Sequence, residues 1–350
     1  MRAQAGWGRA RRMTAVLLAL AALAACGGDD GTSAADDGGS STTEGSSAEA
    51  ASFPVTIEHK YGETTIDEAP ERVVSVGFSD QDFVLALGVT PVGIREWYGE
   101  RPFATWEWAQ DELGDAEPTV LGSEEIDFEE VAALRPDLIV GVSSGMTEED
   151  YDTLSQIAPT LTQSGDYVDY GMPWQDATRM IGQALGKADA AEAIVTDLED
   201  RFTEAQETYP DLVGASGVIA FVMAEDEVGG YSDQDGRSRI LTSLGMHIPQ
   251  NIIDLAGDAF YVSFSAENID RLDADLVVWV AGSDDIIAQI KASPLRGGLP
   301  ASAEGREVFL NEQDAGAASF GSPLSLGYVL DELVPRFAAA VDGDPATPSD

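Results

Sequence analysis

Four arginines are candidates for binding an anionic ligand, because positive charge is scarce in this chain. The sequence has 19 Lys and Arg against 63 Asp and Glu, a formal net charge of −44. Guanidinium groups make paired hydrogen bonds to oxygen anions and also stack on aromatic rings. Aromatic residues lie close to these arginines in the sequence, which predicts a site for a large, flat, oxygen-rich anion. The predicted ligand-binding residues are Arg95, Trp97, Tyr98, Arg101, Ser144, Tyr231, Arg237 and Arg239, the serine coming from a polar loop.

Each of these residues also has a purely structural interpretation. In so acidic a chain, an arginine is expected to pair with a carboxylate at the surface. Aromatic rings commonly pack in a core, and this applies to Trp106 and Trp108 as well as to Trp97. The residue types alone therefore leave both interpretations open.

A second motif is typical of an enzyme. Residues 141–145 satisfy the pattern G-x-S-x-G, the nucleophile elbow of a serine hydrolase, and they follow a predicted strand as that elbow does. A catalytic triad also needs an acid and a histidine. His247 is the only downstream histidine, and strand-like segments follow it, unlike the usual hydrolase order. A secreted serine hydrolase using Ser143 is therefore kept as an alternative, and the main hypothesis is not an enzyme.

The sequence does not predict a metal site held by the protein. The chain has two histidines, His59 and His247, and neither lies near other residues that commonly bind zinc or manganese. A haem needs only one axial tyrosine or histidine, so haem remains possible with Tyr231 or His247 as its ligand.

Two distant segments of the chain resemble each other. Residues 126–141 and 264–279 each have a glutamate near the start of a short predicted helix, then a leucine, an aspartate and an apolar run. Uninterrupted apolar runs predict strands that are buried on both faces. Further strands are predicted at 72–76, 92–94 and 217–223, and helices at 81–87 and 239–244. Strands alternating with helices in both halves predict an α/β fold of two lobes with parallel central sheets.

The predicted binding residues fall where such a fold places a ligand. Ligands bind in the crevice at the carboxyl ends of parallel strands. Loops at these ends are predicted at 78–82, 95–101 and 143–146 in the first lobe, and at 224–231, 237–239 and 282–284 in the second. We therefore expect the arginines and rings to face a cleft between the lobes.

One long helix is predicted to join the lobes. Apolar residues keep helical spacing from 173 to 185 and again from 190 to 209, and Gly186 is expected to end or bend the first part. The predicted division is a signal peptide at 1–25, a flexible tether at 26–52, a first lobe at 53–172, a connecting helical segment at 173–209, a second lobe at 210–341 and a disordered tail at 342–350.

The first 26 residues have the pattern of an export signal. Arginines are followed by an apolar run from Met13 to Ala25, too short to span a bilayer but suited to a secretory signal peptide. The small residues before Cys26, the single cysteine, resemble a lipobox, which predicts lipidation of Cys26. The alternative is an ordinary secretion signal with an incidental cysteine. We expect a lipid-anchored protein on the extracytoplasmic face of the cell membrane.

The charge of the mature chain excludes several partners. Removing residues 1–25 leaves 15 basic and 63 acidic residues, a formal net charge of −48. Such a charge argues against nucleic acid and anionic lipid surfaces, so membrane contact is expected only through the anchor. The sequence also has no G-K-[ST] and no G-x-G-x-x-G motif for binding nucleotide phosphates.

These features together resemble a known class of proteins. The best local matches are Glu-Arg-Val-Val-Ser-Val-Gly at 71–77, Ala-Leu-Arg-Pro-Asp-Leu-Ile-Val at 133–140, Leu-Ser-Gln-Ile-Ala-Pro-Thr at 154–160 and Ile-Gly-Gln-Ala-Leu-Gly at 181–186. The chain resembles, over residues 53 to 340, the helix-bridged solute-binding proteins of ABC importers for ferric siderophores, haem and cobalamin. Residues 93–99 and 104–109 resemble the actinobacterial iron-siderophore subgroup.

The resemblance implies a function, partners and two further residues. It implies capture of a ferric siderophore, such as a catecholate or carboxylate complex, that holds the iron itself, so that no intrinsic cofactor is needed. It implies delivery to an ABC permease with its ATPase by a monomeric protein. Matching the family motif puts the permease-docking glutamates at Glu129 and Glu267. These two carboxylates also suit the start of a helix for electrostatic reasons alone.

Other functions remain open from the sequence. A haem-binding or cobalamin-binding protein of the same class would have the same architecture. A lipid-anchored receptor that binds a ligand without feeding a transporter would also share the fold.

Overall fold

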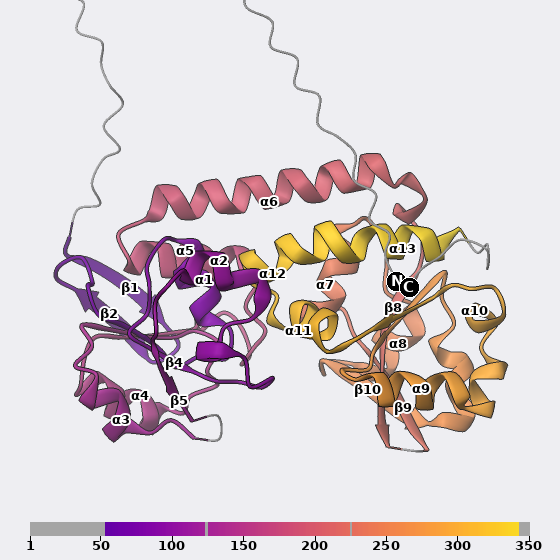
Figure 1. The fold of residues 1–350 in the computed structure, drawn as a ribbon, viewed down its shortest axis with the longest axis horizontal. Coiled ribbons are helices and arrows are strands. Elements are labelled where there is room, and N and C mark those ends of the chain that lie inside the picture. Colours follow the sequence, from indigo (N-terminus) through magenta and orange to yellow (C-terminus); the bar gives the residue numbers. More distant parts are fainter. Residues whose placement is uncertain (1–52, 123–124, 225, 343–350) are drawn as a thin grey trace, which may run out of the picture. The chain divides into compact units, whose positions relative to one another are not determined.

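The computed structural model describes residues 53–122, 125–224 and 226–342. The predicted signal peptide, the tether with Cys26 and the tail from residue 343 lie outside the described residues. Two α/β lobes and a helical connection make up the described chain (Figure 1).

The first lobe is built on a parallel sheet with the strand order β5-β4-β3-β6-β7. Its strands are β3 (Val73–Ser75), β4 (Gly93–Arg95), β5 (Thr119–Leu121), β6 (Leu138–Gly141) and β7 (Thr160–Thr162), and an antiparallel hairpin, β1 (Val55–His59) with β2 (Gly62–Ile66), precedes them. The helices are α1 (Asp80–Ala86), η1 (Pro102–Ala104), η2 (Glu107–Ala109), α2 (Gln110–Leu113), α3 (Phe128–Ala133) and α4 (Glu148–Ser155). The central strands β3 and β6 are buried along their whole length, as continuous apolar runs predict.

The second lobe combines parallel and antiparallel strands in the order β10-β9-β8-β11-β12. Its strands are β8 (Gly217–Ala224), β9 (Glu227–Tyr231), β10 (Tyr261–Ser265), β11 (Leu276–Val280) and β12 (Glu307–Leu310). Strands β8, β11 and β12 are parallel, whereas β9 and β10 add antiparallel strands at one edge. The expectation of a loop over 224–231 was therefore wrong for residues 227–231, because a hairpin turns the chain back into the sheet.

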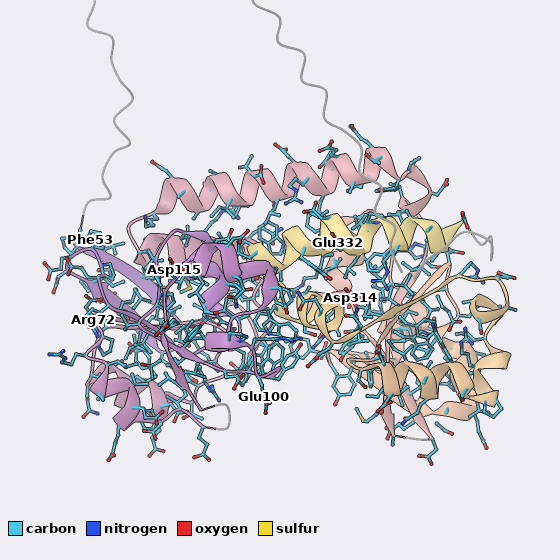
Figure 2. The ribbon with its side chains drawn as sticks, in the orientation of Figure 1. Phe53, Arg72, Glu100, Asp115, Asp314 and Glu332 are labelled. Atoms are coloured by element: carbon cyan, nitrogen blue, oxygen red, sulfur yellow. The ribbon has the colours of Figure 1, made fainter. Side chains whose placement is uncertain are left out.

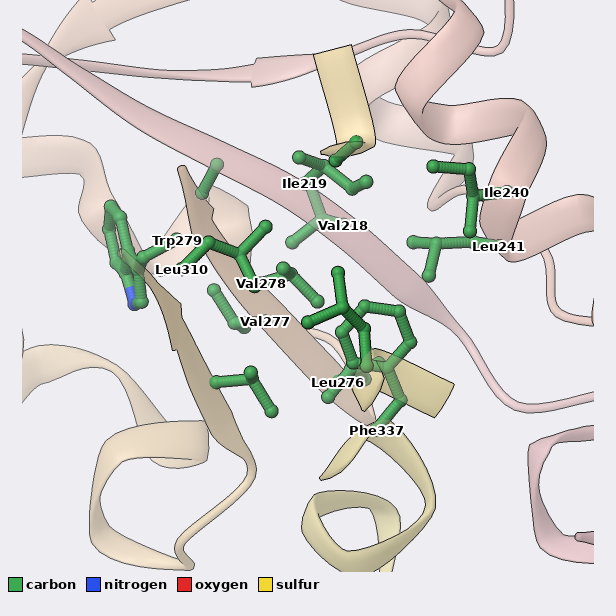
Figure 3. Packing of buried hydrophobic residues seen from close by; sticks show 14 of the residues in the cluster. Val218, Ile219, Ile240, Leu241, Leu276, Val277, Val278, Trp279, Leu310 and Phe337 are labelled. Carbon is green, nitrogen blue, oxygen red and sulfur yellow. The ribbon is translucent and has the colours of Figure 1, made fainter. Parts of the chain in front are cut away.

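Helices pack against this second sheet, and their apolar side chains form the core of the lobe together with those of the strands. They are η3 (Pro210–Leu212), α7 (Gly236–Ser243), α8 (Gln250–Ala256), η4 (Ala266–Leu272), α9 (Asp284–Ala292), η5 (Pro294–Gly298), α10 (Pro300–Ala303), α11 (Glu312–Phe320), α12 (Pro323–Tyr328), the π-helical turn η6 (Val329–Leu333) and α13 (Val334–Val341). Figure 3 shows Val218 of β8 and Val278 of β11 with Leu241 of α7 and Phe337 of α13 packed around them. Each fully buried side chain of this size contributes about 1.5–3 kcal/mol to folding.

The two repeated segments perform the same structural task. Asp137 accepts hydrogen bonds from the backbone N–H groups of Glu71 and Arg72, at 2.9 and 2.8 Å. Asp275 accepts bonds from the N–H and the hydroxyl of Ser216, both at 2.8 Å. Each aspartate lies directly before a strand of the repeat, β6 or β11. Its hydrogen bonds connect the start of that strand to the residues directly before the neighbouring strand, β3 or β8. The bonds from Ser216 also lower the pKa of Asp275.

A helical pair joins the lobes. Helix α5 (Trp174–Ala184) ends before Gly186, which has a φ of +68°, and the 21-residue helix α6 (Ala188–Thr208) follows. Gly182 allows α5 and α6 to approach, because a Cβ there would lie 2.3 Å from that of Ala191. Helix α6 runs along both lobes (Figure 1). Ala191 packs in the core of the first lobe and Phe202 in that of the second. The predicted fold class, two α/β lobes with parallel sheets and a connecting helix, is confirmed.

The chain makes a second link between the lobes near its end. Leu324 of α12 packs against Leu85 and Leu113 of the first lobe. Ser322, which caps α12, donates a hydrogen bond to the buried Asp82 of α1 at 2.6 Å. Asp314 of α11, labelled in Figure 2, is buried. It accepts a hydrogen bond from the hydroxyl of Tyr328 at 2.8 Å. The lobes are therefore held together by packed side chains as well as by α6, and we expect ligand-induced closure to be small.

Candidate functional site

A cavity of about 470 Å³ lies between the two lobes. The first lobe contributes loops that follow β3, β4, β6 and β7, and the second contributes α7, α11 and their flanking turns. The lining residues are Phe78, Ser79, Asp80, Phe83, Trp97, Val142, Ser143, Tyr170, Met172, Trp174, Ala177, Phe202, Asp235, Gly236, Arg237, Arg239, Ile240, Ser243, Phe260, Ser319, Phe320, Gly321 and Leu326. A cavity of this size, walled mainly by apolar groups with a few polar ones, is typical of a site for a small organic ligand.

Stacked rings form much of the wall on the first lobe. Phe78 stacks on Trp97 with ring centroids 5.4 Å apart and on Tyr170 at 6.0 Å. Trp97 also contacts Phe320 of the second lobe at 5.5 Å, so the ring cluster continues across the cavity. Offset and tilted rings at these distances stabilise one another and form a rigid surface for a ligand.

A buried carboxyl group lies in the floor of the cavity. Asp80 accepts hydrogen bonds from the backbone N–H of Ser143 at 3.0 Å and from its hydroxyl at 2.5 Å. Burial raises the pKa of Asp80 to about 6, although the bonds from Ser143 oppose this shift. Gly77 makes room for the carboxyl, because a Cβ at that position would lie 2.0 Å from its Oδ2 atom.

A second buried carboxyl group lies two residues further along α1 and faces the other lobe. Asp82 accepts a hydrogen bond from the Nε1–H of Trp108 at 2.7 Å as well as the bond from Ser322. Burial raises the pKa of Asp82 to about 6, again against these hydrogen bonds. Asp80 therefore shapes the floor of the cavity, whereas Asp82 fixes the position of one lobe against the other.

The second lobe brings charged groups to the cavity. Asp235 caps α7 by accepting the N–H of Arg237, and its carboxylate pairs with the Arg237 guanidinium at 3.0 Å. Arg237 also donates to Ser319 at 3.1 Å and lies 4.4 Å from the ring centre of Tyr231. Burial alone would lower the pKa of Arg237, but Asp235 and Tyr231 raise it above its usual value. This arginine therefore keeps its charge in the cavity.

Arg239 connects the second lobe to the first. Its guanidinium donates to the carbonyl oxygen of Gly171 at 2.9 Å and to that of Gln234 at 3.2 Å. Gly171 precedes α5, so Arg239 spans the side of the cavity where the chain leaves the first lobe.

Three of the eight predicted ligand-binding residues line the cavity: Trp97, Arg237 and Arg239. Two others contact the rings that form the cavity wall on the first lobe, without lining the cavity themselves. Arg95 is buried, with its guanidinium 4.5 Å from the ring centre of Phe78. Tyr98 packs edge-on against Trp97 at 4.8 Å, and burial raises its pKa.

The remaining three also lie outside the lining. Arg101 lies over the ring of Trp106 at 4.3 Å and pairs with Glu312 at 3.4 Å. Ser144 is buried in a turn, where it donates to the carbonyl of Gly141. Tyr231 is at the end of β9, beneath Arg237. A direct contact of these residues with a ligand stays a prediction.

Several lining residues were missed as individual contacts. Phe320 and Ser319 come from the end of α11, which no motif in the sequence marked. Tyr170 and Met172 come from the irregular segment before α5. Asp235 could have been found from the sequence, because an aspartate directly before a helix is a typical cap.

The geometry around Ser143 does not favour a hydrolase. The hydroxyl of Ser143 donates to the Asp80 carboxyl and lies 3.4 Å from that of Ser79. His247, the candidate base, is exposed beside the β-bridge to Ser216 and is not among the lining residues. A nucleophile needs a base within hydrogen-bond reach, and here the serine contacts a carboxyl instead.

Both predicted docking glutamates are exposed and begin short helices. Asp127 caps α3 by accepting the N–H groups of Glu129 and Glu130, both at 3.0 Å. Ser265 caps η4 and accepts the N–H of Glu267 at 3.4 Å. Helix α3 lies on the side of the first lobe away from α6 (Figure 1).

In residues 53–122, 125–224 and 226–342, no three His, Cys, Asp or Glu side chains gather as a possible metal site. Within the same ranges, no helix combines the length and the apolar character needed to cross a bilayer.

Comparison with known proteins decides the family. A family model described as periplasmic binding protein matches residues 73–313. The chain belongs to the periplasmic binding protein family.

Two relatives illustrate the similarity. The chain is 28% identical over 242 residues to the probable siderophore-binding lipoprotein YfiY of Bacillus subtilis, which covers 67% of this chain and 71% of YfiY. It is 23% identical over 294 residues to the ferric-anguibactin-binding protein FatB of Vibrio anguillarum, covering 80% and 87% of the two chains.

Solved structures extend the similarity across the described fold. A periplasmic solute binding protein from Mycobacterium smegmatis has a TM-score of 0.72 and 33% identity, covering 82% of this chain and 99% of that one. PiaA of Streptococcus pneumoniae in complex with ferrichrome has a TM-score of 0.71 and 26% identity, with coverage of 83% and 99%.

Proposed function

We propose that this protein is the extracytoplasmic solute-binding component of an ABC importer and that it captures a ferric siderophore between its lobes. The observation that carries the proposal is the ring-lined interlobe cavity with Arg237 and Arg239, in a chain of the periplasmic binding protein family. The names of YfiY and FatB, and the ferrichrome in the complex of PiaA, support a siderophore as the ligand.

In this proposal the siderophore holds the iron and the protein recognises its organic shell. The rings of Phe78, Trp97 and Phe320 offer apolar surface to that shell, and the arginines offer hydrogen-bond donors to its oxygens. The protein acts by binding and release and carries out no chemical step of its own.

Delivery requires docking to the permease. Glu129 and Glu267 are exposed, one on each lobe, and two separated charges on a rigid body fix the orientation of docking. We therefore assign these two side chains to contact with basic residues of the permease, whose ATPase then drives transport.

The proposed location follows from the leader. Cys26 becomes the lipidated first residue of the mature chain, and the following tether leaves a monomer free to reach the permease at the outer face of the membrane. Mass spectrometry of the intact protein from its native host tests this: a diacylated Cys26 is expected, and an unmodified cysteine would contradict the anchor.

Direct titration tests the ligand. The mature chain is prepared with Cys26→Ser in place of lipidation, and binding is followed by tryptophan fluorescence, because Trp97 lies in the cavity wall. Saturable quenching by a ferric siderophore, without quenching by its iron-free form, is the expected result. Binding of haem or cobalamin alone would replace the siderophore by one of these ligands, and no binding to any of them would contradict the proposal.

A second experiment separates binding from transport. The double variant Glu129→Lys/Glu267→Lys should abolish uptake by cells while siderophore affinity stays unchanged. The matched control is Glu130→Lys with Asp270→Lys, which changes the same number of exposed charges on the same two helices. Loss of affinity in the first variant would contradict the docking role.

A further inference from the structure

The ionisable groups that line the cavity are close to electrical balance. Asp235 and Arg237 form a pair at 3.0 Å, and their side chains are only 10% and 19% exposed. Arg239 supplies a second positive charge, and Asp80 in the floor supplies a second carboxyl. Tyr170 stays uncharged, since burial raises its pKa. With both aspartates ionised, the charges of these lining residues cancel.

Two further arginines, Arg95 and Arg101, contact rings of the first lobe close to the cavity. Arg101 pairs with Glu312 at 3.4 Å and lies 4.0 Å from Glu107. Arg95 lies behind the ring of Phe78 and donates to the carbonyl of Val76, and its charge reaches the lining, where it lowers the pKa of Tyr170 against the effect of burial. At most one positive charge, that of Arg95, is thereby added to the cavity, which is too little to balance a multiply charged anion.

The remaining lining is apolar, which makes a highly charged ligand costly. Moving a multiply charged anion from water into such a cavity is unfavourable unless several unpaired cations meet it. The whole chain opposes an anion as well, because its formal net charge of −44 repels negative complexes as they approach. The local charge balance and the total charge are separate observations, and both favour a ligand without net negative charge.

We propose, on the basis of the proposed function, that the ligand is a ferric complex of zero or positive net charge, and that its class is the trihydroxamates. Three hydroxamate groups neutralise Fe³⁺, and the hydrocarbon linkers between them offer apolar surface to Phe78, Trp97 and Phe320. Tris-catecholate and citrate complexes of iron are anionic and do not suit this cavity. The structure thus changes the sequence-based expectation of an oxygen-rich anion, because the carboxylate of Asp235 already compensates the positive charge of Arg237.

A series of ligands that differ only in charge tests the proposal. Ferrioxamine B carries a free ammonium group far from its iron; acetylation makes the complex neutral, and succinylation makes it negative. Calorimetric titration of the mature Cys26→Ser chain should show about tenfold weaker binding of the succinylated complex than of the other two. Added salt should weaken binding of the ammonium form and strengthen binding of the succinylated form.

One substitution should abolish this preference. Asp235→Asn keeps a side-chain oxygen to cap α7 but removes the charge that compensates Arg237. The succinylated complex should then gain about tenfold in affinity relative to the acetylated one. Asp233→Asn is the matched control, because it removes an exposed charge from the same turn and should leave the ratio unchanged.

The outcomes distinguish this inference from the function on which it rests. If ferric tris-catecholate or ferric citrate binds more tightly than every hydroxamate, or if the succinylated complex binds as well as the others, the charge inference is wrong and the siderophore function stands. If no ferric siderophore of any class binds, the proposed function is wrong and the inference falls with it.

Discussion

The two walls of the cavity are built differently. The wall on the first lobe consists of rings on loops that follow β3, β4 and β7, and Phe78, Trp97 and Tyr170 hold one another by stacking. The wall on the second lobe owes its polarity to one helix, α7, where the capping residue Asp235 pairs with Arg237. One wall therefore provides shape and apolar area, whereas the other provides balanced charge.

The difference shows how each kind of property is encoded. The charge pair depends on residues that are close in the sequence, since Asp235 and Arg237 both lie at the start of one helix. The ring surface depends on residues that are far apart in the sequence, because Trp97 completes it only by contact with Phe320, more than two hundred residues away. Disturbing the charged wall should affect stability most, and disturbing the ring wall should affect binding most.

The largest effect is expected from Arg237→Gln in the charged wall. This change leaves the Asp235 carboxylate buried without its partner, which should cost about 3 kcal/mol of unfolding free energy, as measured by urea denaturation. The double variant Asp235→Asn/Arg237→Gln should recover most of that loss, because no unpaired charge remains. Arg271→Gln, at an exposed site, is the control and should cost under about 1 kcal/mol. A loss below that level for Arg237→Gln would show that the pair does not stabilise the wall.

The ring wall should respond in affinity rather than in stability. Trp97→Ala removes a ring that faces the cavity and should weaken siderophore binding about 30-fold, equivalent to about 2 kcal/mol, measured by calorimetry. Trp97→Phe should retain most of the affinity. Tyr261→Ala is the control, since Tyr261 is an exposed aromatic residue of the second lobe outside the lining. Unchanged affinity in Trp97→Ala would remove the first lobe from the binding surface.

The link between the two lobes through Asp82 and Ser322 should depend on pH. The folded-state pKa of Asp82, about 6, lies above its ordinary value, so the stability that its protonated form contributes is lost as pH rises through about 6. Trp108→Phe removes the Nε1–H that stabilises the ionised form and should raise this pKa further. Unfolding should therefore cost about 1–2 kcal/mol less at pH 8, and the loss should shrink at pH 5.

Trp106→Phe provides the comparison for that experiment. Trp106 stacks on Trp108 at 5.0 Å, so its replacement also removes ring packing from the same cluster. Its effect on unfolding free energy should be the same at pH 5 and pH 8. An equal pH response in both variants would rule out Asp82 as the source.

The smallest effect is expected from Ser143→Ala in the floor of the cavity. The loss of one hydroxyl donor to Asp80 should cost about 1 kcal/mol at pH 8. The loss should be smaller at pH 5, below the Asp80 pKa of about 6, where the carboxyl is protonated. Any trace esterase activity of the preparation should be unchanged. Its complete loss would restore the hydrolase hypothesis for Ser143.

Much of the fold could be predicted because it follows from local patterns. Apolar runs at 138–141 and 276–280 formed buried strands, and the helical spacing after Gly186 formed α6. The antiparallel strand β9 was not predicted, because residues 227–231 contain two glycines and lack a long apolar run. Pairing with β8 and β10 supplies the hydrogen bonds that make this segment a strand.

The site was predicted less completely, for a physical reason. Scarce arginines near rings predicted eight ligand-binding residues, of which Trp97, Arg237 and Arg239 lie in the cavity lining, and their contact with a ligand stays a prediction. The same reasoning could not separate them from Arg101, whose guanidinium is held outside the lining by Glu312. The residue type indicates what a side chain is able to bind, but not whether a carboxylate of the folded protein already pairs with it, as Glu312 pairs with Arg101.

The two-lobed α/β plan, the long connecting helix and the strongly negative charge could be read from the amino-acid sequence, since they depend on composition and on the period of apolar residues. Tertiary contacts were needed to show that Asp80 forms the cavity floor while Asp82 reaches Ser322 in the other lobe. They were also needed to show that Phe320 completes the ring wall beside Trp97. Such contacts join residues far apart in the chain, and packing of whole helices and sheets brings them together, which no local pattern records.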